Sequence, residues 1–539
     1  MSDNMSDNND EKTRRRLDAE ELLERVKEEK RAVSDEGRPD DVEYMHSNDA
    51  LTARERVEYL CDDGTFDEIG QLAAPGPSTP ETVDWDRHDA PADGIVTGIG
   101  EIDGTATAVG SFDFTVKGGS IGHTGFTKLR RILDLSLDNG YPVVLLHEGG
   151  GHRIQEGLDA RPIAHGDYEG TFDMLAKLSG YVPLVSAIMG AGFAGPTNYA
   201  SLCDFVPMVE GRANMGMAGP EIVKAALGKD ISKDDYDARF HTFETGMAHV
   251  SCETDESCLD SIKTFLSYFP RNMTHSPPKM ENTSPPDQRT VENLVDVVPP
   301  NPKKGYDSHD VIDGIVDKGS FFELHENFAQ NLITGFGRID GHSVGIVANN
   351  PRIKAGTIDV DVTSKGPRFI SLCDAYDIPI VFFSDIPGFI PGPDQERRGL
   401  ARHAGKFLSE LGRATTPIIN VTMRRGYGFG YLAMAGGRNA NQLKLVWPTT
   451  EIAGMSIEGA VSLVYADEIE NADDPAAKRQ ELIDEFTSRT GPLRATEDLG
   501  VDAAIDPRDT REMIIHVLER TEPTDTDDLP PKKHGIPPI

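Results

Sequence analysis

The chain has 539 residues, of which 38% are apolar and 27% charged, and its 90 acidic and 54 basic side chains give a net charge of −36. This size suits two large α/β domains, and the charge disfavours nucleic-acid backbones and anionic membranes as partners. No stretch approaches 18 consecutive apolar residues, and the polar N-terminus lacks the apolar core of a secretory signal. We therefore expect a cytoplasmic protein, and the even spread of acidic residues suits the salt-rich cytosol of a halophile.

The predicted elements begin with an acidic N-terminal segment, residues 1–40. Positions 1–16 are polar and are expected to be disordered, whereas apolar side chains at helical spacing predict an amphipathic helix over 17–32. A first domain is expected over 41–273, interrupted by a loop at 74–92. Seven prolines mark 274–304 as a linker, and a second domain follows over 305–539, with a tail after about 521 that is first acidic and then proline-rich.

The two predicted domains repeat each other. VTGIGEIDG and ITGFGRIDG place Gly98 opposite Gly335 and Gly104 opposite Gly341, an offset of 237 in the numbering. YPVVLLHEGGG (141–151) stands opposite IPIVFFSDIPG (378–388) at the same offset, and the next apolar strand repeats at an offset of 234. Strands alternate with helices in both copies, which predicts two α/β domains with largely parallel sheets.

Glycine-rich turns follow two buried strands in each copy, at 147–157, 190–198, 385–392 and 424–437. Ligands of parallel α/β sheets bind beyond the carboxyl ends of the strands, and converging backbone N–H groups there form an oxyanion hole. A simple tight turn is the alternative at any single position. His147, Glu148 and His152 do not have the spacing of a zinc-protease motif, so no metal site is predicted.

Longer motifs then point to a family. HEGGGHRIQEG, FFELHENFAQNLITGFGRIDGHSVGIVANNP, DIPIVFFSDIPGFIPG, WPTTEIAGM and the final KKHGIPPI occur here in order. Over roughly residues 50–539 the chain resembles the carboxyltransferase (β) subunits of biotin-dependent acyl-CoA carboxylases, of the propionyl-CoA and acetyl-CoA types. The resemblance implies a tandem pair of crotonase-like (ββα spiral) domains, with acyl-CoA on the N-terminal side and carboxybiotin on the C-terminal side, within a homohexamer.

The implied activity is transfer of a carboxyl group from carboxybiotin to the α-carbon of an acyl-CoA. The biotin-attachment motif Ala-Met-Lys-Met and an ATP-binding glycine loop are absent. Biotin is therefore expected on a partner, the biotin carboxylase or biotin carboxyl carrier subunit, with a coenzyme A thioester as substrate. Both the enolate and the biotin ureido group develop negative oxygen, so the family uses two backbone oxyanion holes.

The resemblance assigns the site residues by position. The oxyanion-hole N–H groups fall on Gly151, His152, Phe429 and Gly430. Substrate-binding positions fall on Gly150, Arg153, Gly195 and Leu432, and Lys117, Lys128, Arg130 and Arg131 are candidates for the CoA phosphates. Phe429 stands where the family has glycine, and Leu432 where the propionyl type has aspartate.

Two alternatives stay open from the sequence. One is the same fold acting on another CoA thioester, or as an acyl-CoA decarboxylase with or without biotin. The other is a non-catalytic scaffold that binds CoA, for which the altered Gly-Phe-Gly turn at 428–430 is the support.

Overall fold

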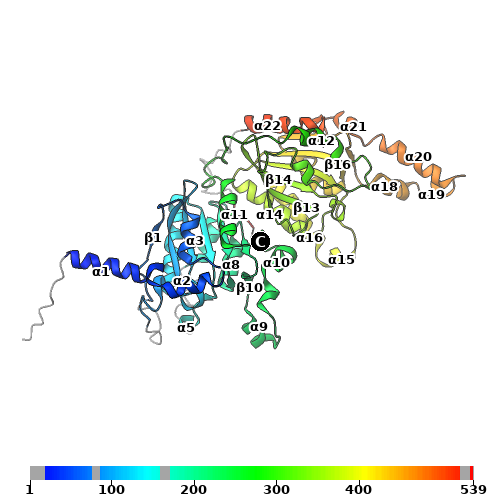
Figure 1. Ribbon diagram of the computed structural model, residues 1–539. Coiled ribbons are helices and arrows are strands. Elements are labelled where there is room, and N and C mark those ends of the chain that lie inside the picture. The colour runs from blue at the N-terminus through cyan, green and yellow to red at the C-terminus, as the bar shows by residue number, and fades with distance from the viewer. Residues whose placement is uncertain (1–18, 76–84, 158–169, 522–533, 538–539) are drawn as a thin grey trace, which may run out of the picture.

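The computed structural model describes residues 19–75, 85–157, 170–521 and 534–537. Figure 1 shows two halves side by side, an N-terminal one in blue to green and a C-terminal one in green-yellow to red. Each half is built on a mixed sheet, as the sequence predicts. Within the described ranges no helix is long and apolar enough to cross a membrane.

The N-terminal sheet has seven strands in the order β1-β2-β3-β5-β7-β9-β11. They are β1 (Asp67–Ile69), β2 (Ile95–Ile102), β3 (Thr105–Phe112), β5 (Val143–His147), β7 (Leu184–Ile188), β9 (Pro207–Val209) and β11 (Val250–Cys252). From β3 onward all neighbours are parallel. Every residue of β5 and β7 is buried, because helices such as α4 (His123–Asn139), α7 (Thr171–Leu178) and α11 (Asp255–Ser267) cover the sheet.

The C-terminal sheet repeats this arrangement in the order β12-β13-β14-β15-β16-β17-β19, with β18 beside β16. Its strands are β12 (Phe322–Leu324), β13 (Leu332–Ile339), β14 (His342–Asn349), β15 (Ile380–Ile386), β16 (Ile418–Tyr427), β17 (Leu443–Val446), β18 (Glu451–Ala453) and β19 (Ala503–Ala504). The main helices are α14 (Val362–Ala375), α16 (Leu400–Arg413) and α22 (Thr510–Arg520).

The strand positions confirm the predicted repeat with its offset of 237. β2 and β13 begin at Ile95 and Leu332, which keep this offset, and β3 and β14 keep it from their first residue to their last. β5 and β15 begin at Val143 and Ile380, again at the same offset. The shared glycine frame therefore marks the same hairpin in both halves.

One apolar core joins the two halves. Phe269 of the N-terminal half lies 5.0 Å, between ring centroids, from Phe336 of the C-terminal half, and Phe205 lies 5.8 Å from Phe322. All belong to, or pack against, a single buried cluster. The halves are consequently fixed against each other by the same hydrophobic packing that builds each of them.

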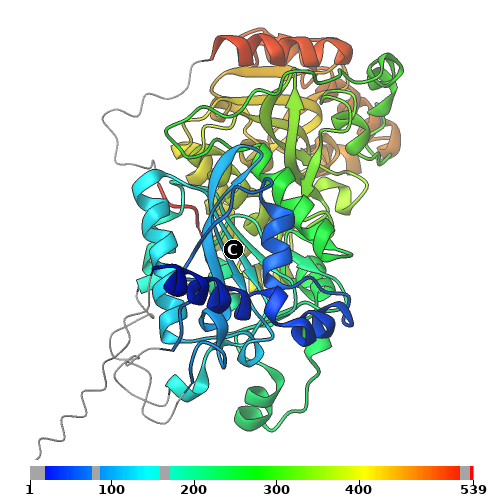
Figure 2. The same cartoon turned by 60° about the vertical axis from the view of Figure 1, so that its left-hand side comes forward.

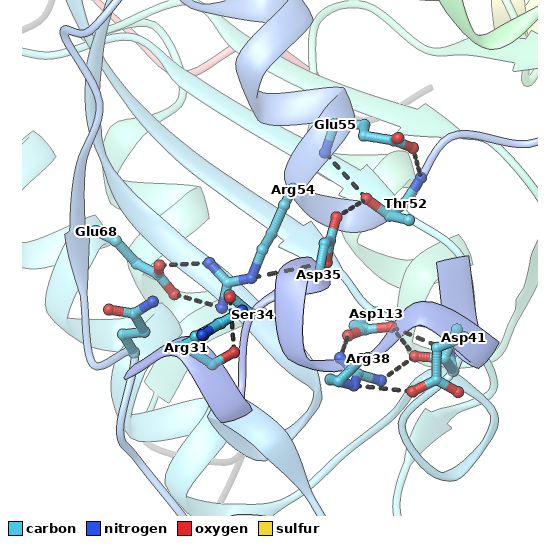
Figure 3. Close-up of polar contacts among 12 residues, drawn as sticks. Arg31, Ser34, Asp35, Arg38, Asp41, Thr52, Arg54, Glu55, Glu68 and Asp113 are labelled. Carbon is cyan, nitrogen blue, oxygen red and sulfur yellow. Dashed lines mark hydrogen bonds and ion pairs between the residues drawn. The ribbon is translucent and has the colours of Figure 1, made fainter. Parts of the chain in front are cut away.

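The N-terminal helix α1 (Ala19–Ala32) agrees with the predicted amphipathic helix, but none of its residues is buried. Ion pairs fasten the chain after it to the first sheet (Figure 3): Arg38 binds Asp41 at 2.8 Å and Asp113 at 2.7 Å. Thr52 and Glu55 form a capping box at α3 (Ala53–Leu60). The described part of the N-terminal segment is thus attached to the first domain on both sides of position 40. Residues 1–16 lie outside the described residues.

The proline-rich segment 274–304 contains a helix, α12 (Gln288–Val297), that the proline count concealed. Leu294 of this helix is fully buried in the C-terminal core. The last described residues, 534–537, cross back to the N-terminal half (Figure 2), where the Ile536 N–H donates to Ser179 Oγ at 3.0 Å. Of the residues after 521, the structure describes only 534–537.

Candidate functional site

In the N-terminal half, the glycine turns after β5 and β7 meet. The first contains the short strand β6 (Gly151–His152) and the second leads into α8 (Gly195–Leu202). A Cβ added to Gly151 would lie 3.0 Å from the Gly195 nitrogen, and the φ of Gly151 is +79°. Only glycine combines this close approach with this backbone conformation.

The C-terminal half brings its two turns together in the same way. Gly388 follows β15, and Gly430 lies in α17 (Gly428–Ala433) directly after β16. A Cβ on Gly430 would lie 2.9 Å from the Gly388 Cα and 2.7 Å from Ile386 Cγ1. Gly388 follows Gly151 at the offset of the repeat, 237, and Gly430 follows Gly195 at nearly the same one, 235. Each half therefore carries one copy of the same pair of turns.

Backbone N–H groups at these turns point away from the helices that follow them. The first N–H groups of a helix have no intrahelical acceptor, which applies to Gly195 in α8 and to Phe429 and Gly430 in α17. Ala194, in contrast, donates its N–H to the Gly216 carbonyl at 2.8 Å. The available donors suit an oxygen that gains negative charge during a reaction.

Buried ion pairs hold the first turn of each half. Glu148, at the end of β5, accepts a hydrogen bond from Arg56, which also donates to Asp255 at 2.9 Å. In the C-terminal half Asp385 accepts from Arg424 at 3.0 Å and from Arg425 at 2.6 Å. Glu148 and Asp385 again occupy equivalent positions of the repeat.

Arg153 lies inside the protein. Its guanidinium is fully buried and pairs with Asp93 at 2.6 Å and Glu156 at 2.8 Å. The backbone N–H of Arg153 donates to the Ile121 carbonyl at 3.0 Å. This residue therefore anchors the loop that carries Gly151 from inside the protein.

The four candidate cations for CoA phosphates are placed differently from one another. Lys128 is buried, and its Nζ donates to the carbonyls of Ala92 and Ile95 at 2.9 and 2.5 Å. Burial lowers the pKa of Lys128 to about 7. Arg130 pairs with Asp134 at 2.7 Å. Arg131 and Lys117 are exposed, and the Lys117 ammonium lies 4.3 Å from the Trp85 ring centroid.

The side chains beside the N–H groups are largely apolar. His152 is half-buried with its ring 5.8 Å from Phe126, and burial lowers its pKa to about 4, so the imidazole is neutral at pH 7. Phe429 is 42% exposed and its ring lies 5.2 Å from that of Phe389. Leu432, one turn further on, is 38% exposed.

The sequence analysis included Gly388 and Phe389 in the glycine-rich turn at 385–392 but named neither of them as a site residue. The offset of the repeat, counted from Gly151, was the signal that could have identified Gly388. His147 is buried between the rings of Phe112 and Tyr199. In the ranges that the structure describes, no group of three or more His, Cys, Asp or Glu side chains could hold a metal ion.

Each pair of turns belongs to its own half. The main neighbours of α8 are β6, β7, α7, β8 (Ala191–Phe193) and β10 (Asn214–Gly216), all N-terminal. Those of α17 are β15, β16, α16 and the short helix η8 (Gly437–Asn439), all C-terminal. The chain thus carries two separate groups of backbone donors, and not one site assembled from both halves.

Comparison with known proteins agrees with this geometry. Residues 45–537 match the model of the carboxyl transferase domain. A propionyl-CoA carboxylase carboxyltransferase subunit of Haloferax mediterranei is 40% identical over 96% of this chain and 99% of its own length. A methylmalonyl-CoA decarboxylase alpha subunit of Veillonella parvula is 35% identical over 96% and 99%.

Among solved structures, the transcarboxylase 12S hexamer with methylmalonyl-CoA and methylmalonic acid bound has a TM-score of 0.87 and 36% identity, covering 97% of this chain and 99% of that one. The two halves are accordingly a tandem pair of crotonase-like domains, as expected from the sequence. The match over nearly the whole chain shows that this protein belongs to the carboxyl transferase family and is an enzyme of the carboxyltransferase subunit type.

Proposed function

We propose that the chain transfers the carboxyl group of carboxybiotin, carried on a separate protein, to the α-carbon of an acyl-CoA, with propionyl-CoA as the preferred class. The observation that carries this proposal is the repeated pair of glycine turns, because the reaction has two oxygens that gain negative charge. The relatives named for propionyl-CoA and methylmalonyl-CoA chemistry support the choice of substrate.

The N-terminal turns suit the acyl-CoA thioester. The N–H groups of the Gly151–His152 strand and of Gly195 lie where the two turns meet, so they can stabilise the oxygen of an enolate. Lys117, Arg130 and Arg131 supply positive charge within the same half for the CoA phosphates. The neutral His152 presents no charged group of its own at this turn.

The C-terminal turns suit the ureido ring of carboxybiotin. The N–H groups at the start of α17 fit its oxygen, and the neighbouring, mutually tilted rings of Phe389 and Phe429 offer an apolar wall for its bicycle. Carboxybiotin supplies the CO2 and the nitrogen that receives the α-proton. The role of this chain is then to orient both reactants and to stabilise the two developing oxyanions.

A homohexamer with biotin carboxylase and biotin carrier subunits is the proposed assembly. The solved relative is described as a hexamer, and large apolar side chains are exposed on both halves. They include Ile222 and Leu227 on α9 (Pro220–Leu227), at 59% and 68%, and Leu463 and Val464 on α18 (Ile457–Val464), at 73% and 70%. Both elements project from the body of the molecule in Figure 1, as contact surfaces for other copies would.

The test is a carboxylation assay with the purified chain, its biotinylated carrier subunits, ATP and radiolabelled bicarbonate. We expect acid-stable label in propionyl-CoA first, and less in acetyl-CoA and butyryl-CoA. Absence of label with every acyl-CoA, in buffers from low to multimolar salt, would refute carboxyl transfer. The same assay without carrier is the control.

Decarboxylation is the second candidate, because two relatives at 35% identity are methylmalonyl-CoA decarboxylase alpha subunits. It predicts release of CO2 from methylmalonyl-CoA with biotinylated carrier and no ATP. Net carboxylation that needs ATP and is faster than this release would favour the first candidate.

A further inference from the structure

A cavity of about 540 Å³ lies where the two halves meet, away from both pairs of glycine turns. Its N-terminal wall comes from Glu244, Thr245, Gly246 and His249, and its C-terminal wall comes mainly from α14 and α16. No glycine of the four turns lines it, and the proposed reaction does not use it.

Two buried basic side chains of α14 form part of this cavity. Lys365 is 4% exposed, and its Nζ donates to the carbonyls of His325 and Phe328 at 2.9 and 3.0 Å. Arg368 is 9% exposed and donates to the carbonyls of Cys203 and Asp204 at 2.6 and 3.4 Å. Within the described ranges neither forms an ion pair with a carboxylate, and the Nε of Arg368 has no partner.

The hydrogen bonds of His249 reveal a missing acceptor. Its Nδ1 accepts the N–H of Val206 at 3.0 Å, so the neutral ring carries its proton on Nε2. This Nε2 lies 3.4 Å from Nη1 of Arg368, which is itself a donor. The Nε2 of His325 donates to the Gly246 carbonyl at 2.9 Å, and in the described residues no hydrogen bond joins its Nδ1 to His249 or Arg368. Two buried donors thus face each other across the cavity lining.

The buried carboxylate of Asp204, which lies close enough to Arg368 to act on its charge, forms no hydrogen bond with either donor within the described residues. Asp204 accepts hydrogen bonds from the Leu184 N–H at 3.0 Å and the Tyr376 hydroxyl at 3.3 Å, and burial raises its pKa to about 6. Taking a guanidinium out of water is costly unless an anion accompanies it. A bound anion beside Arg368 and His249 would offset that cost and accept from both donors.

The remaining lining defines which anion fits. Leu324, Phe328, Phe369 and Leu372 make one side apolar, and the volume far exceeds that of a single ion or water of about 30 Å³. Three carboxylates, of Glu244, Asp361 and Glu410, lie at the more exposed lining and disfavour a dianion. We propose that this cavity binds a small organic monocarboxylate, with its carboxylate on Arg368 and His249 and its short apolar chain against Leu324 and Phe369.

Calorimetric titration of the full-length protein with butyrate tests the site, in the presence of saturating coenzyme A so that the CoA site is filled. We expect saturable binding, at least about tenfold tighter than that of inorganic phosphate, chloride or n-butanol. His249→Phe and Arg368→Met should each weaken butyrate binding by about tenfold or more. Arg402→Gln, an exposed arginine on α16 that does not line the cavity, is the matched control and should bind as the unaltered protein does.

Crystals of the unaltered protein soaked with 4-bromobutyrate make the test independent of whether the variants fold. We expect a bromine anomalous peak in this cavity. Equal binding of phosphate or n-butanol, displacement of butyrate by coenzyme A, or the lack of a bromine peak would each overturn the proposal.

Discussion

Lys128 and Lys365 are equivalent residues of the two halves, on α4 and α14. Each is buried, and each donates from Nζ to two backbone carbonyls that lie before, or at the first residue of, the first hairpin strand. Burial lowers the pKa of both to about 7. The feature common to both halves is therefore a pair of hydrogen bonds that joins a helix to a neighbouring backbone segment, rather than a contact to a ligand.

The surroundings of this lysine differ between the two halves. A Cβ on Gly70 would lie 2.7 Å from the Lys128 Cε, so the chain beside β1 closes over this lysine. Lys365 instead lines the cavity between the halves. The neighbouring arginines diverge likewise, since Arg131 is exposed whereas its equivalent, Arg368, is buried. The two halves thus share the hydrogen bonds that hold the backbone, whereas the packing around each residue determines whether it is covered, exposed or part of a cavity.

The turn carboxylates show the same divergence. Glu148 is held by Arg56 of α3, a helix that precedes the first sheet, and Arg56 is shared with Asp255. Asp385 is held by Arg424 and Arg425 of the adjacent strand β16. The same requirement, a fixed turn, is met with partners from different parts of the chain.

The largest expected effect comes from removing Asp385. Asp385→Asn leaves two buried arginines without their carboxylate, and we expect the free energy of unfolding to fall by about 3–5 kcal/mol. Chemical denaturation measured by fluorescence gives this value. Glu148→Gln is the matched variant. It should lower the free energy of unfolding by less, because Arg56 keeps its ion pair with Asp255. An equal loss in both variants would show that the two networks are energetically equivalent.

Next in size is the effect of filling a glycine turn. In Gly430→Ala the new methyl meets Ile386 and Gly388, which displaces the N–H groups of α17, so carboxyl transfer should fall by about 10²–10³-fold. The carboxylation assay with radiolabelled bicarbonate measures this loss of carboxyl transfer. Gly405→Ala in α16 is the control, because a Cβ there has no neighbour within 4 Å.

Gly151→Ala is the N-terminal counterpart of Gly430→Ala and should reduce transfer to a similar extent, since a positive φ adds strain to the close approach. Normal turnover in either variant would remove that turn from the proposed mechanism.

The paired lysines predict a pH dependence of stability. Between pH 7 and 10.5 the unfolded chain keeps the lysine proton that the folded chain releases, so stability rises with pH by at most about 1.4 kcal/mol per unit for each lysine. Lys128→Met should flatten this rise, as measured by denaturation at pH 7, 8 and 9. Lys365→Met should flatten it equally, and an unchanged slope in both variants would contradict the lowered pKa values.

The smallest effect is expected at Arg131, the exposed partner of Arg368 in the repeat. Arg131→Gln should change the free energy of unfolding by roughly 0.5 kcal/mol or less. It should raise KM for propionyl-CoA by about two- to fivefold if it contacts a phosphate, as an exposed charge contact does. Steady-state kinetics with Arg402→Gln as control would reveal it, and an unchanged KM would remove Arg131 from the CoA site.

Much of this fold could be predicted from the sequence, because glycine frames and apolar runs are local patterns. The offset of 237 marked equivalent hairpins in both halves through their paired glycines, and the apolar runs at 141–151 and 378–388 contain the strands that begin at 143 and 380. The helix α12 was hidden, since its buried face is Leu294 and a few neighbours between prolines.

The sequence by itself determined the tandem repeat, the family and the four glycine turns, since these depend on spacing and on positions where a positive φ or a close backbone approach favours glycine. Only the tertiary structure decided which charges are interior. Arg153 was expected at a substrate-binding position and Lys128 as a cation for the CoA phosphates, yet both side chains are buried, where carboxylates or carbonyls from distant segments surround them. Burial depends on what packs above a residue, and for the basic groups at the junction of the halves that covering comes from the other half of the chain.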